Sequence, residues 1–132
     1  FASRKPHITI PNWISLEIRP DAGRLREIYN SSVIFLHPSH REGWPLPPAE
    51  SMMCGCAVVA ASNKGVQEYI VHNESGLLSP IGNVDAMIKN IQFLLDNSRE
   101  RVRITKGGQA RINKYSWEKN AKQLEEILVN AI

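Results

Sequence analysis

Residues 33–61 read VIFLHPSHREGWPLPPAESMMCGCAVVAA, and they are the most informative segment for the fold. Two apolar runs of strand length, Val33–Leu36 and Cys56–Ala61, bound the segment and are rich in β-branched residues. Continuous apolar runs are typical of strands that are covered on both faces, as in a parallel sheet between helices. The segment therefore predicts two neighbouring strands of an α/β protein.

A short helix is predicted between these strands. Pro47 and Pro48 suit the first turn of a helix, where a missing N–H leaves no hydrogen bond unmade. Gly55 is placed to end the helix. Met52 and Met53 are expected to face its core side.

Further elements are predicted outward from this unit. On the N-terminal side we expect a strand over Trp13–Ile18 and a helix that Asp21 caps, with Leu25, Ile28 and Tyr29 on one face. On the C-terminal side we expect a short helix over Gly65–Val71 and a very short strand over Gly76–Leu78.

The last third of the chain is predicted to be helical. Asn83 caps an amphipathic helix, and a second helix over Arg99–Asn113 is expected to be interrupted at Gly107-Gly108. Ser116 caps a final helix whose apolar side chains are expected to face inward: Ala121, Leu124, Ile127, Leu128 and Ala131. The sum is an α/β fold, with a Rossmann-like parallel sheet, flanking helices and a helical C-terminal tail.

Composition limits the possible functions. The 132 residues suit one domain, and the net charge of +3 permits an anionic ligand but argues against nucleic acid as a partner. No apolar run has the length of a membrane span, and no secretory leader is visible, so we expect a cytoplasmic protein. Cys54 and Cys56 are expected to be buried, reduced thiols without a metal.

Two loops are the candidate binding regions. In open α/β sheets, ligands bind beyond the carboxyl ends of the strands, where helix N-termini attract anions. The loops at residues 37–46 and 62–66 follow the two predicted strands and lead into helices. The chain contains neither a GxGxxG motif nor a P-loop lysine, which disfavours NAD binding and ATP hydrolysis.

Glu42 and Glu50 are the outstanding polar residues, and two interpretations are open. They could be acids that cap a helix start. Alternatively, each carboxylate could accept two hydrogen bonds from a vicinal diol, one on a ribose and one on a hexose, as a nucleotide-sugar would require.

Several neighbouring side chains have two interpretations as well. His37 and His40 suit packing better than catalysis, and Trp44 suits a packing anchor better than a stacking platform. Arg41 and Lys64 suit solvated positions, but each lies close enough to a helix start to neutralise phosphate.

The order and spacing of these motifs resemble a known family. The string Pro38-Ser39-x-x-Glu42-Gly43-Trp44-Pro45-Leu46 through Glu50 resembles the E-x7-E signature of retaining GT-B glycosyltransferases, especially glycosyltransferase family 4. AESMMCGCAVVA, GVQEYI, NESGLL and the Tyr-Ser-Trp near the last helix follow the family's order too, so the resemblance covers about Leu25 to Leu128.

The resemblance implies a domain that binds a nucleotide-diphosphate sugar, without a metal or other cofactor. Glu50 would bind the ribose hydroxyls, and Glu42, the catalytic candidate, would lie by the transferred sugar. The other donor-binding candidates are Gly43, Trp44, Pro45, Leu46, Lys64, Gly65 and Val66.

Departures from the family define what we expect of the whole protein. The family's N-terminal acceptor domain, its first Rossmann strands and the Arg and Lys that grip the diphosphate are not identifiable before Leu25. Residues 1–132 are therefore expected to be a truncated donor-binding domain, inactive alone, of a parent enzyme that glycosylates a glycan or a lipid, the latter at the cytoplasmic membrane face. A non-catalytic nucleotide or sugar-binding module is the main alternative, and a glycoside hydrolase is a remote one.

Overall fold

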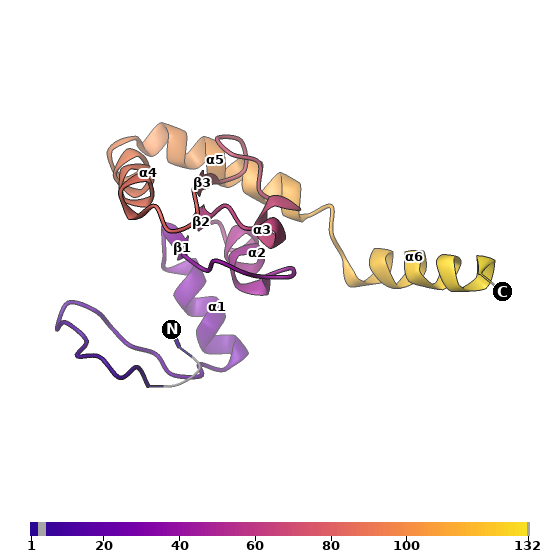
Figure 1. Cartoon of the computed structure of the whole chain (residues 1–132), viewed down its shortest axis with the longest axis horizontal. Coiled ribbons are helices and arrows are strands. Elements are labelled where there is room, and N and C mark those ends of the chain that lie inside the picture. The colour runs from indigo at the N-terminus through magenta and orange to yellow at the C-terminus, as the bar shows by residue number, and fades with distance from the viewer. Residues whose placement is uncertain (3–4, 132) are drawn as a thin grey trace.

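The computed structural model describes residues 1–2 and 5–131 and shows a parallel sheet between helices (Figure 1). The sheet contains β1 (Ile34–His37), β2 (Ala57–Ala61) and β3 (Leu77–Ser79), in the order β1-β2-β3. Ile34 pairs with Ala57 across the first ladder, and Val59 pairs with Leu77 across the second, both in parallel. The predicted α/β class and its parallel sheet are confirmed.

The helices largely begin where the sequence places a cap. Asp21, Asn63, Asn83 and Ser116 each accept a backbone hydrogen bond from the first turn that follows. The helices are α1 (Ala22–Asn30), α2 (Leu46–Met53), α3 (Lys64–Gln67), α4 (Val84–Asp96), α5 (Ser98–Ile112) and α6 (Trp117–Asn130).

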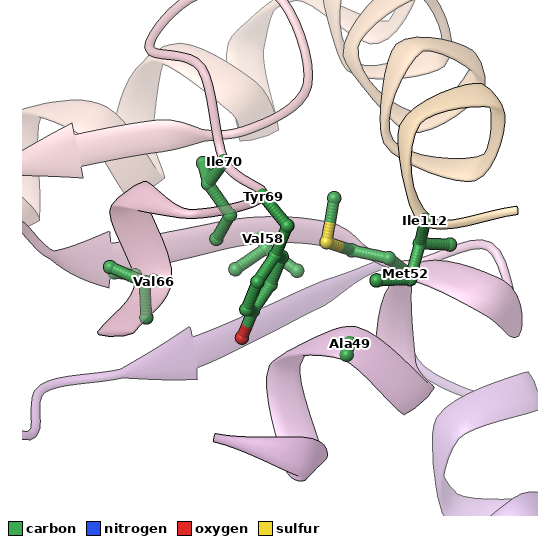
Figure 2. Packing of buried hydrophobic residues seen from close by; sticks show 8 residues of the cluster. Ala49, Met52, Val58, Val66, Tyr69, Ile70 and Ile112 are labelled. Atoms are coloured by element: carbon green, nitrogen blue, oxygen red, sulfur yellow. The ribbon is translucent and has the colours of Figure 1, made fainter. Parts of the chain in front are cut away.

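The hydrophobic core lies on both faces of β2, in which every residue is buried. Alternate residues of a strand point to opposite faces, so Val58 and Ala60 contact one cluster and Ala57 and Val59 contact the other. Figure 2 shows the first cluster, in which Met52 of α2 and Tyr69 approach Val58. The second cluster joins β2 to Leu77 of β3, Leu94 of α4 and Ile104 of α5.

Two local expectations are wrong. Trp13–Ile18 forms no strand: Ile18 makes a single parallel bridge to Ala2, and Trp13 is 81% exposed. Met53 is also exposed, whereas Met52 is fully buried, because only one face of α2 lies against the sheet.

Helix α5 runs without interruption through Gly107-Gly108, contrary to expectation. These glycines allow the loop at Glu74 and Ser75 to pack directly on the helix. A Cβ at Gly107 would overlap the Glu74 carbonyl oxygen, and one at Gly108 would lie 3.1 Å from the Ser75 carbonyl oxygen. Both positions therefore need glycine because the backbone of the loop lies directly against the backbone of α5, and the pair does not interrupt the helix.

Helix α6 does not pack inward as expected. None of its residues is buried, and Figure 1 shows it extending away from the rest of the chain. Leu124, Ile127 and Leu128 are each more than half exposed. The amphipathic pattern is present, but the part of the chain that the structure describes supplies no surface to cover it.

Candidate functional site

The topology brings the two predicted loops to the same edge of the sheet, because β1 and β2 are parallel neighbours. Direct contacts then join the loops. The Asn63 side-chain amide donates to the Ser39 carbonyl oxygen over 2.8 Å. The α-carbon of Gly65 lies against the chain at Glu42 and Gly43, so that a Cβ there would be only 2.5 Å from the Gly43 carbonyl oxygen. The start of α3 therefore supports the loop that carries Glu42.

Glu42 lies in this loop beside the end of β1. Its side chain is 35% exposed, and its Oε1 is 3.8 Å from Nε2 of His37. Burial lowers the pKa of His37, while the charge of Glu42 acts in the opposite direction. The His37 Nε2 is buried and makes no hydrogen bond to any residue that the structure describes. A largely neutral imidazole thus lies behind the Glu42 carboxylate.

Trp44 closes the loop against the body of the domain. Its ring centroid is 4.7 Å from that of Tyr69 and 5.7 Å from that of Tyr115. The Tyr69 hydroxyl donates to the Pro45 carbonyl oxygen over 2.8 Å, and burial, followed by the charge of Glu42, raises the pKa of Tyr69. The packing interpretation of Trp44 is confirmed, although 37% of the residue stays exposed.

The N-terminus of α2 begins at Leu46 and has no side-chain cap. Neither Glu42 nor Glu50 caps it, so the capping interpretation is wrong for this helix. Pro47 and Pro48 have no backbone N–H group, so they cannot donate a hydrogen bond from the first turn. Leu46, which is half exposed, has the backbone N–H group that remains there.

Glu50 projects from α2 and is partly buried. Its Oε2 accepts a hydrogen bond of 3.1 Å from the Tyr29 hydroxyl. Tyr29 lies 21 positions earlier, in the last turn of α1, and the sequence pattern predicts only that it lies on an apolar helix face. No local pattern could have revealed the contact, because it depends on how α1 packs beside α2.

The residues expected at the second loop differ in accessibility. Lys64 is exposed, whereas Gly65 and Val66 are buried. The Val66 amide donates to the Asn63 side-chain oxygen over 3.1 Å, so the capping bond already uses that N–H group.

The described residues form neither a metal-binding cluster nor a membrane-spanning helix. Among the described residues, no group of three or more His, Cys, Asp or Glu side chains is arranged to hold a metal ion. The helices of the described ranges are all too short or too polar to cross a bilayer. Both cysteines are free; Cys56 is buried as expected, whereas Cys54 is only partly so.

A known protein family matches the part of the chain that contains this site. Residues 18–111, which include both loops and both glutamates, match the family of glycosyl transferases group 1. The chain belongs to this family.

Two proteins that the chain resembles are longer than the chain. It is 29% identical over 115 residues to an uncharacterized glycosyltransferase of Haemophilus influenzae, covering 86% of this chain and 33% of that relative. Sucrose-phosphate synthase of Thermosynechococcus elongatus superposes with a TM-score of 0.71 at 28% identity, covering 80% of this chain and 27% of that one. The chain thus spans about a third of the first of these proteins and about a quarter of the second.

The structural neighbours share the GT-B fold, which confirms the expected Rossmann-like architecture. Anabaena HepE, solved in complex with UDP-glucose, superposes with a TM-score of 0.78 at 23% identity, covering 87% of this chain and 31% of that one. At this identity the likeness is one of fold.

Proposed function

We propose that this chain is the donor-binding part of a retaining family 4 glycosyltransferase that holds a nucleotide-diphosphate sugar. The observation that carries the proposal is the contact between the two loops at the carboxyl edge of the sheet. In this contact Gly65, at the start of α3, lies against the backbone of Glu42 and Gly43. The same loop then leads into α2, which begins at Leu46 and carries Glu50. HepE, a structural neighbour of this chain, was solved in complex with UDP-glucose, and this supports a ligand of the same class here.

Glu42 is the catalytic candidate in this proposal. Breaking the bond between the sugar and the diphosphate leaves positive charge at the anomeric carbon, and a fixed carboxylate nearby stabilises it. The neutral His37 behind Glu42 leaves the carboxylate's charge uncompensated, which favours this role. Retention then follows from attack by the acceptor on the face that the diphosphate leaves.

The diphosphate would lie at the N-terminus of α2. The helix dipole there attracts negative charge, and the Leu46 amide is a donor at this end of α2. Lys64, exposed at the start of α3, would add a positive charge from the second loop. Gly43 and Pro45 would shape the loop around the sugar, and no metal is required. Gly65 and Val66 would act through the support that α3 gives to the loop. The acceptor, a glycan or a lipid, would be glycosylated on the cytoplasmic side.

Titration of the isotopically labelled chain with UDP, GDP and dTDP tests the proposal through backbone amide shifts. We expect shifts at Gly43, Trp44, Leu46 and Glu50 with at least one nucleotide. The amides of α6, which lies away from this edge, should stay unchanged and serve as an internal control.

A matched pair of variants separates site binding from general charge effects. Glu50→Gln should reduce the nucleotide shifts, whereas Glu118→Gln, an exposed acid on α6, should not. If no nucleotide shifts any amide at millimolar concentration, the chain does not bind a donor by itself and the proposal fails for it.

A further inference from the structure

Tyr29 contacts the candidate site from outside both loops. It occupies the last turn of α1 and is only 3% exposed. Its hydroxyl donates to Oε2 of Glu50 over 3.1 Å, which makes it the side chain that hydrogen-bonds this carboxylate among the described residues. The contact joins two helices that are separate in sequence and meet beside the sheet.

Contacts on several sides fix the position of the Tyr29 ring. The Phe35 ring of β1 lies edge-on to it, with the centroids 5.7 Å apart and an interplanar angle of 72°. The Phe1 ring lies 6.1 Å away at 76°. At the backbone, the Cys56 thiol donates to the Tyr29 carbonyl oxygen over 3.2 Å and ties the end of α1 to the start of β2.

The protonation state of the phenol suits a permanent donor. Burial, together with the adjacent Glu50 charge, raises the pKa of Tyr29 well above its ordinary value. The hydroxyl therefore keeps its proton throughout the physiological range. It holds one carboxylate oxygen, and no described residue hydrogen-bonds the other, Oε1.

We infer that Tyr29 is a positioning residue that fixes the Glu50 carboxylate so that its second oxygen can accept hydrogen bonds from the ribose of the donor nucleotide. The inference rests on the proposed function, because it assigns Tyr29 a role only if Glu50 binds ribose. A carboxylate held at one oxygen has a defined plane, and less conformational freedom is lost when the ligand binds.

Tyr29→Phe tests this role because it removes the hydroxyl and keeps the ring that packs on Phe35. We expect the Kd for UDP, measured by calorimetry on the 132-residue chain, to rise about 10- to 100-fold, which corresponds to the loss of a hydrogen bond to a charged group. Tyr115→Phe is the matched control, since its hydroxyl donates to the Glu68 carbonyl oxygen instead. That variant should bind UDP like the wild type.

A ligand without ribose hydroxyls separates positioning from general damage to the fold. The Kd for 2′,3′-dideoxy-UDP should be the same for Tyr29→Phe and wild type. In a Glu50→Gln background, Tyr29→Phe should add less than about a twofold loss of UDP affinity, because glutamine has already lost the second acceptor oxygen that Tyr29 would orient toward the ribose. This double-mutant cycle stays informative even if Tyr29→Phe also lowers the melting temperature.

The outcomes distinguish the two proposals. If wild type binds UDP and Tyr29→Phe binds it equally well, the positioning role is wrong and donor binding stands. Equal losses with UDP and the dideoxy ligand, or additive losses with Glu50→Gln, also overturn the positioning role. If wild type binds none of UDP, GDP and dTDP, the proposed function fails and the role of Tyr29 fails with it.

Discussion

At the scale of single residues, the two glutamates have different surroundings. Glu42 lies in a loop with 35% of its side chain exposed and a buried imidazole behind it. Glu50 is partly buried on a helix, and a phenol holds one of its oxygens. An exposed carboxylate with uncompensated charge suits charge stabilisation, whereas an oriented one suits directional recognition of hydroxyls.

This difference predicts different kinetic effects in a full-length enzyme that contains the chain. Glu42→Gln should lower kcat by about 10²- to 10³-fold, the effect of losing one preorganised electrostatic group. Its Kd for the donor nucleotide should change little. Glu50→Gln should mainly raise KM for the donor. Steady-state kinetics and nucleotide calorimetry measure both, and an equal loss of donor affinity in the two variants contradicts the assignment.

His37 predicts a pH dependence of stability. Its pKa in the folded chain is lowered by burial from the usual 6.5, and only partly restored by Glu42. The unfolded chain therefore binds the His37 proton more readily. Stability is present above about pH 6.5 and is lost as the pH falls toward the folded-state pKa.

Urea unfolding at pH 7.5 and 5.5 measures this effect. His37→Gln cannot titrate, so the difference in unfolding free energy between the two pH values should be smaller than in the wild type. His40→Gln, which changes an exposed histidine of the same loop, is the control. If His37→Gln kept the pH dependence of the wild type, the buried imidazole would contribute nothing to the change in unfolding free energy between the two pH values.

At the scale of elements, α3 matters more for its packing than for its length. Its Asn63 side chain caps the helix and also donates to the Ser39 carbonyl oxygen, so one residue ties the second loop to the first. Gly65 then allows the two backbones to touch. The sequence indicates both loops, but the contact between them follows only from the parallel pairing of β1 with β2.

Gly65→Ala should therefore disturb the site through the backbone. The added methyl group would meet the carbonyl oxygens of Glu42 and Gly43, neither of which can move as a side chain could. We expect a loss of about 1–3 kcal/mol in unfolding free energy, as for other overpacked positions, and weaker nucleotide binding.

Gly23→Ala is the control for that change. Gly23 is an exposed residue of α1, where an added Cβ would come no closer than 3.4 Å to the Asp21 side chain. The control should be neutral or stabilise by up to about 1 kcal/mol, because alanine favours a helix. Similar denaturant midpoints for both variants would mean that the close approach at Gly65 carries no strain.

At the scale of the whole molecule, what the sequence predicts depends on how local the signal is. Asp21, Asn83 and Ser116 mark helix starts correctly because a cap bonds within its own first turn. The buried run of β2 is likewise a local pattern. The exposure of α6, the uninterrupted α5 and the Tyr29–Glu50 bond all depend on which distant surface a side chain meets.

Helix α6 shows most clearly what a local sequence pattern cannot predict, namely which surface covers an apolar helix face. It also allows a test on the whole molecule. Its 14 residues include none that is buried, so it contributes no side chain to either core cluster. Tyr115, by contrast, packs on the first cluster and must be retained.

A chain ending at Ser116 should therefore melt within about 2 °C of the full chain, since a core contribution of 1 kcal/mol would shift the transition by several degrees. Its nucleotide affinity should also be unchanged. Thermal unfolding followed by circular dichroism measures the first quantity, and a chain ending at Asn113, which lacks Tyr115, should melt clearly lower. A large drop on removal of α6 alone would show that its apolar face is covered in solution by the domain itself.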